Sequence, residues 1–112
     1  MTTYTLAQLV APQQLGNADA SLYQVSANQT VKIGRAVFCN TTGSAVTLTA
    51  GVTSGAALSV STTFISARTL APGETYVSPE LSGMVLPASW TIRAYSGTAS
   101  AISVEISGLV VS

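Results

Sequence analysis

The sequence of 112 residues is poor in the side chains that perform chemistry. It contains no histidine, one cysteine and eight charged residues, four of each sign. Acid-base catalysis, nucleophilic catalysis and metal binding all draw on titratable or coordinating groups. The full supply is Asp19, Lys32, Arg35, Arg68, Glu74, Glu80, Arg93, Glu105 and Cys39. This scarcity favours a protein that binds or builds, so we expect no enzyme activity, no catalytic residues, no metal and no cofactor.

The charge content is also low. Charged residues make up 7% of the chain and the formal net charge is zero, whereas soluble domains average about 25%. No basic cluster is present to neutralise phosphates, so nucleic acids and membrane surfaces are not expected partners. A surface with so little charge has little protection against association. We therefore expect part of it to be covered by other protein, in a homo-oligomer or a larger assembly.

The single cysteine, Cys39, cannot form a disulfide within the chain. No histidine or lysine stands beside it in sequence to lower its pKa, so a small buried hydrophobe in a strand is favoured over a reactive thiol. The N-terminus lacks a basic region followed by an apolar stretch, and no run approaches eighteen apolar residues. The pattern therefore predicts neither a signal peptide nor a membrane span.

Apolar and small polar residues alternate in several stretches, namely 46–52, 90–95 and 102–107. A period of two places one row of side chains on a buried face and the other in water, as in a half-buried strand. Residues 31–39 begin with this alternation and end in an apolar run, which predicts a central strand covered on both faces. Residues 53–70 are less regular and predict one strand around 58–65.

Turn residues punctuate these strands at 40–44, 71–74 and 96–100, where hairpins would need them. Fifteen serines and fifteen threonines, together with many β-branched residues, suit a pleated sheet better than a helix. We therefore predict an all-β fold, an antiparallel β-sandwich of the jelly-roll or immunoglobulin-like kind with seven or eight strands.

The first twenty residues precede the first clearly predicted strand, so we expect an N-terminal arm at 1–20 and the sandwich domain at 21–112. The arm is apolar, and its candidate assembly-interface residues are Tyr4, Leu6, Leu9 and Val10. It must either pack on its own domain or be buried against another subunit, and we favour the second. One helical turn over residues 4–10, ended by Pro12, is an alternative local structure.

Two sharper hypotheses concern a sugar site. The aromatic residues that could stack on sugar rings are Tyr23, Tyr76, Trp90 and Tyr95. Trp90 is in phase with Ile92 and Ala94, however, which favours a core position. Glu74 and Glu80 could be offered as a glycosidase pair, but each follows a proline in a turn, where a solvated side chain is typical.

Several signatures lie along most of the chain: a Leu-Tyr-x-Val strand, a Cys-Asn strand end with a Thr-Gly turn, a Leu-Ala-x-Gly-Glu-Thr-Tyr turn, a Gly-x-Val-Leu segment and a Thr-Ile-Arg-Ala strand. The positions are Leu22, Tyr23, Val25, Cys39, Asn40, Thr42, Gly43, Leu70, Ala71, Gly73, Glu74, Thr75, Tyr76, Gly83, Val85, Leu86 and Thr91 to Ala94. With these signatures the chain resembles small β-sandwich structural proteins of tailed bacteriophages. Residues 88–90 depart from the Gly-Asp type of turn expected before Thr91.

The resemblance implies a virion structural protein that is made in the host cytoplasm and assembles with other virion proteins. Members of that group serve as head decoration, collar or tail components, and the resemblance does not choose between these places. The alternative function is a carbohydrate-binding or receptor-recognition module of a tail appendage.

Overall fold

The structure, a computed structural model, describes residues 3–54 and 57–112, and all regular elements in these ranges are strands. The strands are β1 (Tyr4–Gln14), β2 (Ala20–Gln24), β3 (Thr30–Asn40), β4 (Val46–Thr53), β5 (Thr63–Leu70), β6 (Thr75–Val77), β7 (Val85–Leu86), β8 (Thr91–Ser96) and β9 (Ile102–Val111). The described residues hold no helix long and apolar enough to cross a membrane.

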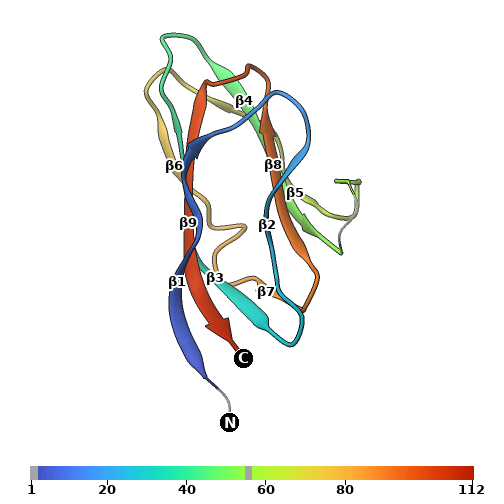
Figure 1. Ribbon diagram of the computed structural model, residues 1–112. Coiled ribbons are helices and arrows are strands. Elements are labelled where there is room, and N and C mark those ends of the chain that lie inside the picture. Colours follow the sequence, from blue (N-terminus) through green and yellow to red (C-terminus); the bar gives the residue numbers. More distant parts are fainter. Residues whose placement is uncertain (1–2, 55–56) are drawn as a thin grey trace.

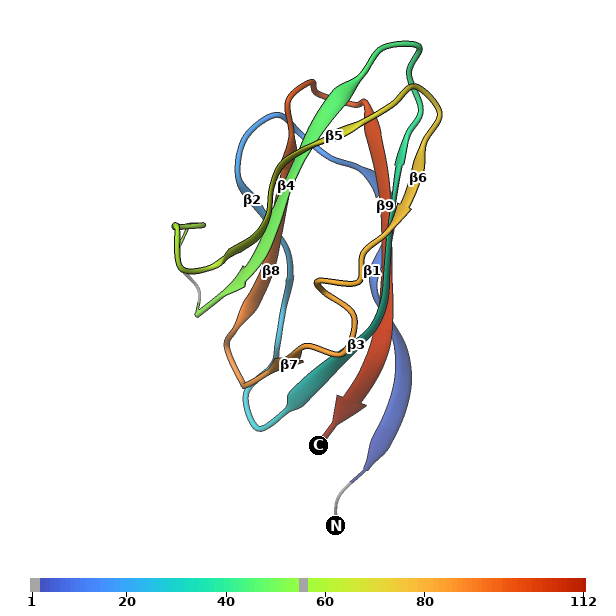
Figure 2. The ribbon, with the colours of Figure 1, turned by 180° about the vertical axis from the view of Figure 1, so that it is seen from behind.

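The strands form two antiparallel sheets that face each other (Figure 1). Sheet A has the order β1-β9-β3-β6, with β7 also paired to β3, and sheet B has the order β2-β8-β4-β5. Seen from behind, the two layers run side by side along the length of the molecule (Figure 2). The predicted all-β antiparallel sandwich is confirmed. The strand count is nine rather than seven or eight because β6 and β7 span only three and two residues.

The three predicted hairpins are wrong. The turns at 40–44, 71–74 and 96–100 join β3 to β4, β5 to β6 and β8 to β9, and each of these pairs is split between the two sheets. The turn residues reverse the chain as expected, but the chain then enters the opposite layer. Of the connections that the structure describes in full, none joins two strands that are paired with each other.

The core lies between the sheets and follows the period of two. Phe38, Leu48, Ile92 and Ile106 each have 0% exposure, and their neighbours along each strand point outward. Trp90 is only partly buried and packs against this cluster from the residue before β8. The expected strand in the irregular zone is displaced: β5 begins at Thr63, and residues 55 and 56 of that zone lie outside the described residues.

The N-terminal segment differs from the expectation. Residues 4–14 form a strand rather than a helical turn, and β1 pairs with β9 from Tyr4 opposite Val111 to Gln14 opposite Ser103. Over these residues the segment is therefore part of sheet A and not an arm outside a complete sandwich. The reason is that Leu9, Val10 and Leu15 fill the core of their own chain.

Asn40, at the end of β3, holds one end of the sandwich together. Its buried Nδ2 donates to the carbonyl oxygens of Ser44, Leu70 and Ala71 at 2.7, 3.1 and 3.2 Å. Its Oδ1 accepts hydrogen bonds from the amide and the hydroxyl of Thr42. Two turn signatures quoted above, the Cys-Asn strand end with its Thr-Gly turn and the Leu-Ala-x-Gly-Glu turn, thus have a structural explanation, because the side chain of one turn satisfies the backbone of the other.

The turn before β6 is closed by its own residues. Gly73 adopts a φ of 73°, a conformation that glycine takes without strain. The carboxylate of Glu74 accepts a hydrogen bond from the amide of Ala71 at 2.7 Å. Glu74 therefore caps a turn, which explains its place in the Leu-Ala-x-Gly-Glu signature.

Candidate assembly face

The outer face of sheet A, the side turned away from sheet B, carries one continuous row of side chains across four strands. Leu6 on β1 is opposite Leu109 on β9, Leu109 is opposite Lys32 on β3, and Lys32 is opposite Val85 on β7. Because successive residues of a strand alternate between faces, and their neighbours Ile33 and Leu86 are buried, this row points outward. Three of its four members are apolar.

Parallel rows extend this outer face along the strands. One contains Gln8, Ser107 and Arg35, and another contains Glu105, Val37 and Val77. Tyr4 and Val111 form a further pair at the end where both termini lie (Figure 1). The amide of Gln8 donates to the carboxylate of Glu105 at 3.3 Å, which places both side chains on this face.

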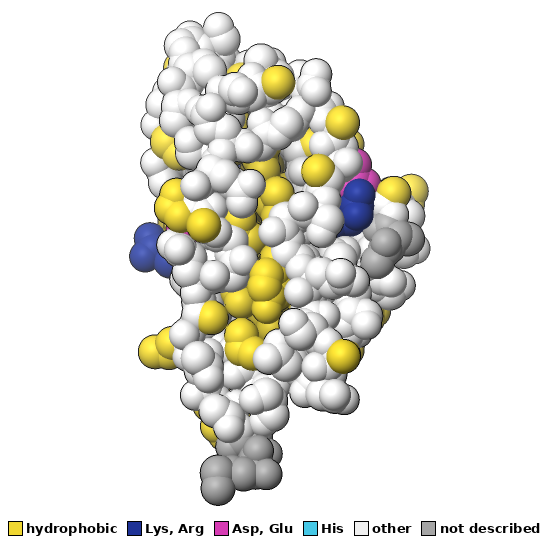
Figure 3. All heavy atoms as spheres, viewed as in Figure 1, with side chains coloured by type: hydrophobic (Ala, Val, Ile, Leu, Met, Phe, Trp, Pro, Cys, Tyr) yellow, Lys and Arg dark blue, Asp and Glu magenta, His cyan; other side chains and the backbone are white. Residues whose placement is uncertain are grey.

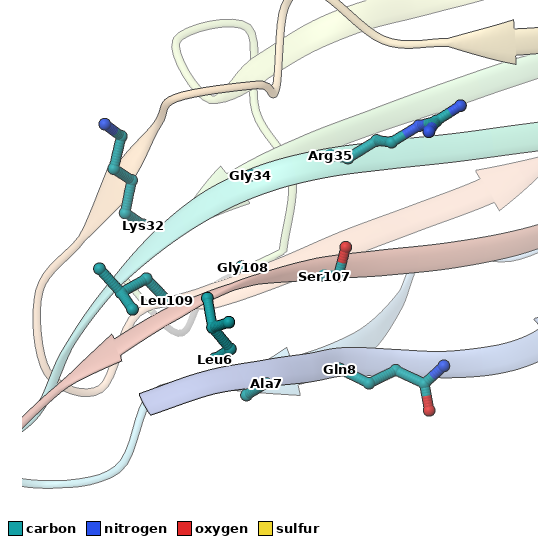
Figure 4. A pocket seen from close by; sticks show the side chains of 9 residues that line it. All are labelled: Leu6, Ala7, Gln8, Lys32, Gly34, Arg35, Ser107, Gly108 and Leu109. Atoms are coloured by element: carbon teal, nitrogen blue, oxygen red, sulfur yellow. The ribbon is translucent and has the colours of Figure 1, made fainter. Parts of the chain in front are cut away.

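A groove of about 700 Å³ lies on the face between β1, β9 and β3. Gly34 and Gly108 form its floor without side chains, and Leu6 and Leu109 lie beside each other at one end (Figure 4). Lys32 and Arg35 rise from β3 along its side. The groove thus offers apolar contact area together with two cations.

Exposed apolar side chains are concentrated on this outer face. Six large hydrophobic residues are exposed in the described part of the chain, and four of them belong to it. These four are Tyr4, Leu6, Val77 and Val85, at 68%, 86%, 46% and 61% exposure. Single exposed hydrophobics need no explanation, whereas a group on one sheet face is typical of a surface that contacts another molecule.

The flank between edge strands β1 and β2 is also incompletely covered. In the view of Figure 3 a band of hydrophobic atoms runs down the middle of the molecule, between the two sheets. Partly buried apolar residues packed against the core include Ala7, Leu22, Tyr23 and Val110. Core side chains therefore reach the surface beside β1.

The four predicted interface residues divide into two pairs. Tyr4 and Leu6 lie on the outer face, whereas Leu9 and Val10 have 7% and 1% exposure and pack in the core of their own chain. Sequence reasoning missed Val77, Val85 and Leu109 as members of this face. The apolar run at the end of residues 31–39 was a signal for this face, because it predicted a strand that is covered on both sides. The strand, β3, is central in sheet A, yet Val37 and Cys39 on its outward side are only partly buried in the single chain.

The aromatic residues do not form one sugar-stacking surface. Tyr76 is buried at 8% exposure, and Tyr23 and Trp90 pack against the core. Tyr95 lines a hollow of about 420 Å³ on sheet B. Glu74 is held in its turn, and the described residues contain no cluster of His, Cys, Asp and Glu that could hold a metal ion.

Glu80 and Tyr76 form a hydrogen-bonded pair with shifted pKa values. The Tyr76 hydroxyl donates to Glu80 Oε1, and the Ser78 hydroxyl donates to the same atom at 3.1 Å. The bond from Tyr76 lowers the pKa of the Glu80 carboxyl below its usual 4.5. Burial, and then the bond to Glu80, raises the pKa of the Tyr76 hydroxyl above its usual 10.0. These bonds stabilise the loop that follows β6.

An ion pair joins β8 in sheet B to the loop before β2. Arg93 Nε on β8 donates to Asp19 Oδ1 at 2.9 Å, and Asp19 Oδ2 accepts the amide of Leu58 at 2.8 Å. Asp19 thus joins the loop before β2 to the loop before β5. Both carboxylate oxygens of Asp19 accept hydrogen bonds from the chain itself, so we assign this ion pair to the stability of the fold.

Comparison with family models and with curated protein sequences gave no match. Among solved structures, the chain is similar to the infectious bursal disease virus Gx strain structure, with a TM-score of 0.53, 12% identity and coverage of 99% of this chain and 37% of that one. It is also similar to the infectious bursal disease virus VP2 subviral particle, with a TM-score of 0.53, 16% identity and coverage of 98% and 32%. The structure of the Gt strain of the same virus is similar with a TM-score of 0.50 and 14% identity, and the match covers 98% of this chain and 32% of that one.

These likenesses show the fold. At 12 to 16% identity they carry no residue-by-residue correspondence. The chain spans about a third of the length of the chains it matches. A β-sandwich of this kind therefore occurs within a longer chain of the VP2 subviral particle.

Proposed function

We propose that this protein is a virion structural protein of a tailed bacteriophage, acting by protein-protein assembly as an oligomeric capsid decoration protein or a head-tail (collar) component. One observation carries the proposal: four of the six exposed large hydrophobics of the described chain lie on the outer face of sheet A. Other protein is the partner that such a face fits, because it mixes apolar side chains with few charges.

The energetics favour covering this face. Complete burial of a valine or leucine side chain contributes about 1.5–3 kcal/mol. Leu6, Val77 and Val85 are each far from that limit in the single chain. Lys32 and Arg35 flank the groove and add the chance of charge pairing with an acidic partner group. An assembly that covers the face gains these contributions without changing the fold.

Three further findings support the virion role. The fold occurs in a protein of a subviral particle, VP2, and the turn signatures resemble those of phage sandwich proteins. The central strand β3 carries an apolar run whose outward members, Val37 and Cys39, are only partly buried in the single chain. Each finding is what a building block of a particle needs, since its surface is completed by neighbours.

The carbohydrate-binding alternative has weaker support. Tyr95 lies beside Val60 and Thr63 in a hollow, but the other three aromatic residues contribute to the core. A single aromatic ring offers one stacking platform, whereas the assembly face offers a continuous apolar row. We therefore keep this function as an outcome of the test below.

The test is to locate the protein on the particle and then to substitute residues of the outer face of sheet A. Purified particles should contain the protein by mass spectrometry, and antibody labelling should place it at the head or neck. Particles that lack the protein should bind added wild-type protein and should fail to bind the Val77→Lys/Val85→Lys variant. Val60→Lys is the matched control, because Val60 is 98% exposed but lies on the loop before β5.

Absence of the chain from purified particles would overturn the proposal. If the double variant binds the particles as well as the wild type does, the outer face of sheet A is not the surface that binds them. Binding to host glycans that is lost in Tyr95→Ala would support the alternative function instead.

A further inference from the structure

The two sheets have four free edges, and three of them are protected against pairing with another chain. β2 is five residues long and contains a register shift, and β6 and β7 span three and two residues. β5 carries Arg68 and is distorted at Ala67, where φ is 47°. Short strands, bulges and charges are the usual means of blocking a sheet edge. The fourth edge is β1, which is eleven residues long and contains no charged residue.

Protection of β1 is confined to its second half. Register shifts fall between Gln8 and Val10 and between Val10 and Gln13, and Pro12 lies in the same part. From Tyr4 to Gln8 the pairing with β9 is regular, from Val111 to Ser107. Residues 4–8 therefore form a regularly paired, uncharged edge next to the outer face of sheet A.

The hydrogen-bond pattern fixes which backbone groups this edge presents. Thr3 and Ser112 exchange two hydrogen bonds, at 2.8 and 2.9 Å, so they are a hydrogen-bonded pair of the ladder. In an antiparallel ladder such pairs alternate along the strand. Thr5 and Ala7 consequently bond to β9, and the N–H and C=O groups of Tyr4, Leu6 and Gln8 point away from it.

We propose that this edge pairs with the same edge of a second copy, antiparallel, with Leu6 opposite Leu6. The contact rests on the assembly function proposed above and names one of its partners. In this register Leu6 exchanges two hydrogen bonds with its counterpart, and Tyr4 exchanges two with Gln8 at each end. All outward backbone groups of the three residues are thereby satisfied across a two-fold axis.

The side chains suit a second copy. Leu6 is 86% exposed and comes to lie beside its counterpart on a joined outer face, and Tyr4 comes to lie beside Gln8. Like charges stay apart, because Lys32 is two strands from the edge. With strands spaced at about 4.8 Å, the two Lys32 residues lie about 24 Å apart, beyond the screening length of about 8 Å.

Cysteine cross-linking in the full chain tests the register. In a Cys39→Ser background, Leu6→Cys should form a disulfide-linked dimer under mild oxidation, because residues opposite each other in a hydrogen-bonded pair have Cα atoms about 5.5 Å apart. Tyr4→Cys alone should not cross-link, since its counterpart lies about 14 Å away along the strand. A mixture of Tyr4→Cys and Gln8→Cys chains should cross-link to each other.

Sedimentation of the uncross-linked chain gives an independent measurement. The wild type should self-associate reversibly with rising concentration, and Leu6→Pro should not, because it removes an N–H that points out of the sheet. Val60→Lys, at an exposed position on the loop before β5, is the control and should still associate. If Leu6→Pro lowers the β signal in circular dichroism, the cross-linking pattern alone decides.

Three results would overturn the pairing. The first is a wild type that stays monomeric at every soluble concentration, and the second is cross-linking of Tyr4→Cys as strong as that of Leu6→Cys. The third is loss of self-association in Val85→Lys but not in Leu6→Pro. Failure of this contact is distinguishable from failure of the assembly function. A monomeric chain that still rebinds particles would keep the virion role and remove only the β1 contact.

Discussion

The guanidinium of Arg68 lies over the ring of Tyr76, with its Cζ atom 4.1 Å from the ring centroid. Arg68 is on β5 in sheet B and Tyr76 is on β6 in sheet A, so the contact links the two layers where the chain crosses between them. The Tyr76 hydroxyl in turn donates to Glu80. Three side chains thus hold this side of the sandwich closed.

Arg68→Ala should lower the free energy of unfolding by about 0.5–1 kcal/mol, the usual contribution of a cation-π contact at an exposed site. Urea denaturation at neutral pH measures the change. Arg35→Ala is the matched control, because Arg35 is an exposed arginine beside the groove on the outer face, and it should change stability by no more than about 0.5 kcal/mol. Equal losses in the two variants would contradict a specific role for the ring contact.

The Tyr76–Glu80 bond should make part of the stability depend on acid pH. Since the bond lowers the pKa of Glu80 in the folded state, its contribution is complete above the usual value of 4.5 and is lost as pH falls through the lowered pKa. Denaturation midpoints between about pH 6 and pH 3 should therefore fall less in Glu80→Gln than in the wild type. Tyr76→Phe should reduce the dependence in the same way, and unchanged pH profiles in both would refute the assignment.

Asn40→Ala should cost about 3 kcal/mol, because it removes the donor that three backbone carbonyls share at a buried position. Asn40→Asp should cost at least as much at neutral pH, since a carboxylate would face the same three oxygens. Thermal or urea unfolding measures both. Asn17→Ala, at an exposed loop position, is the control and should stay within about 0.5 kcal/mol. A loss of less than 1 kcal/mol in Asn40→Ala would show that water replaces the amide.

Two core truncations should differ in size. Phe38 has 0% exposure, so Phe38→Ala should cost about 3–5 kcal/mol. Trp90 is only partly buried beside the core, so Trp90→Ala should cost less, about 2 kcal/mol. Equilibrium unfolding of both variants checks the order. A larger loss in Trp90→Ala would mean that the indole supports more of the core than its exposure indicates.

The sequence predicted the class of fold because period-two alternation is a local property. Residues 46–52 and 102–107 carry it clearly and are strands in the structure. The pairing of strands is not local, and this is why all three expected hairpins were wrong. A turn such as 40–44 reverses the chain in the same way whether the next strand joins the same sheet or the opposite one.

The candidate site was predictable only in part. Tyr4 and Leu6 stood out as apolar residues in a segment that was expected to lie outside the sandwich. Leu9 and Val10 are equally apolar residues of the same segment, but they belong to the core. Leu9 is out of phase with Leu6, so alternation alone turns it inward, whereas Val10 reaches the core through the register shift after Gln8, which no residue pattern announces. Val85 joined the face only through its pairing with Lys32, a contact across more than fifty positions in sequence.

Gly108 is the residue whose size should matter most to the assembly face. A Cβ atom there would lie 2.2 Å from the carbonyl oxygen of Lys32 and 3.1 Å from the amide nitrogen of Gly34. Both neighbours are backbone of β3, so they cannot move without breaking the ladder beneath the groove. Gly108→Ala should therefore cost about 3 kcal/mol and weaken self-association, measured by urea unfolding and sedimentation.

Gly43→Ala is the control for this last variant, since a Cβ atom at Gly43 would meet nothing within 4 Å. It should leave both properties nearly unchanged. Hydrogen exchange adds a local readout: in Gly108→Ala the amides of Thr5 and Ala7, which bond to β9, should exchange faster than in the wild type. Normal stability and exchange in Gly108→Ala would show that β3 and β9 can separate at this point, and the groove would then be a soft feature rather than a fixed docking surface.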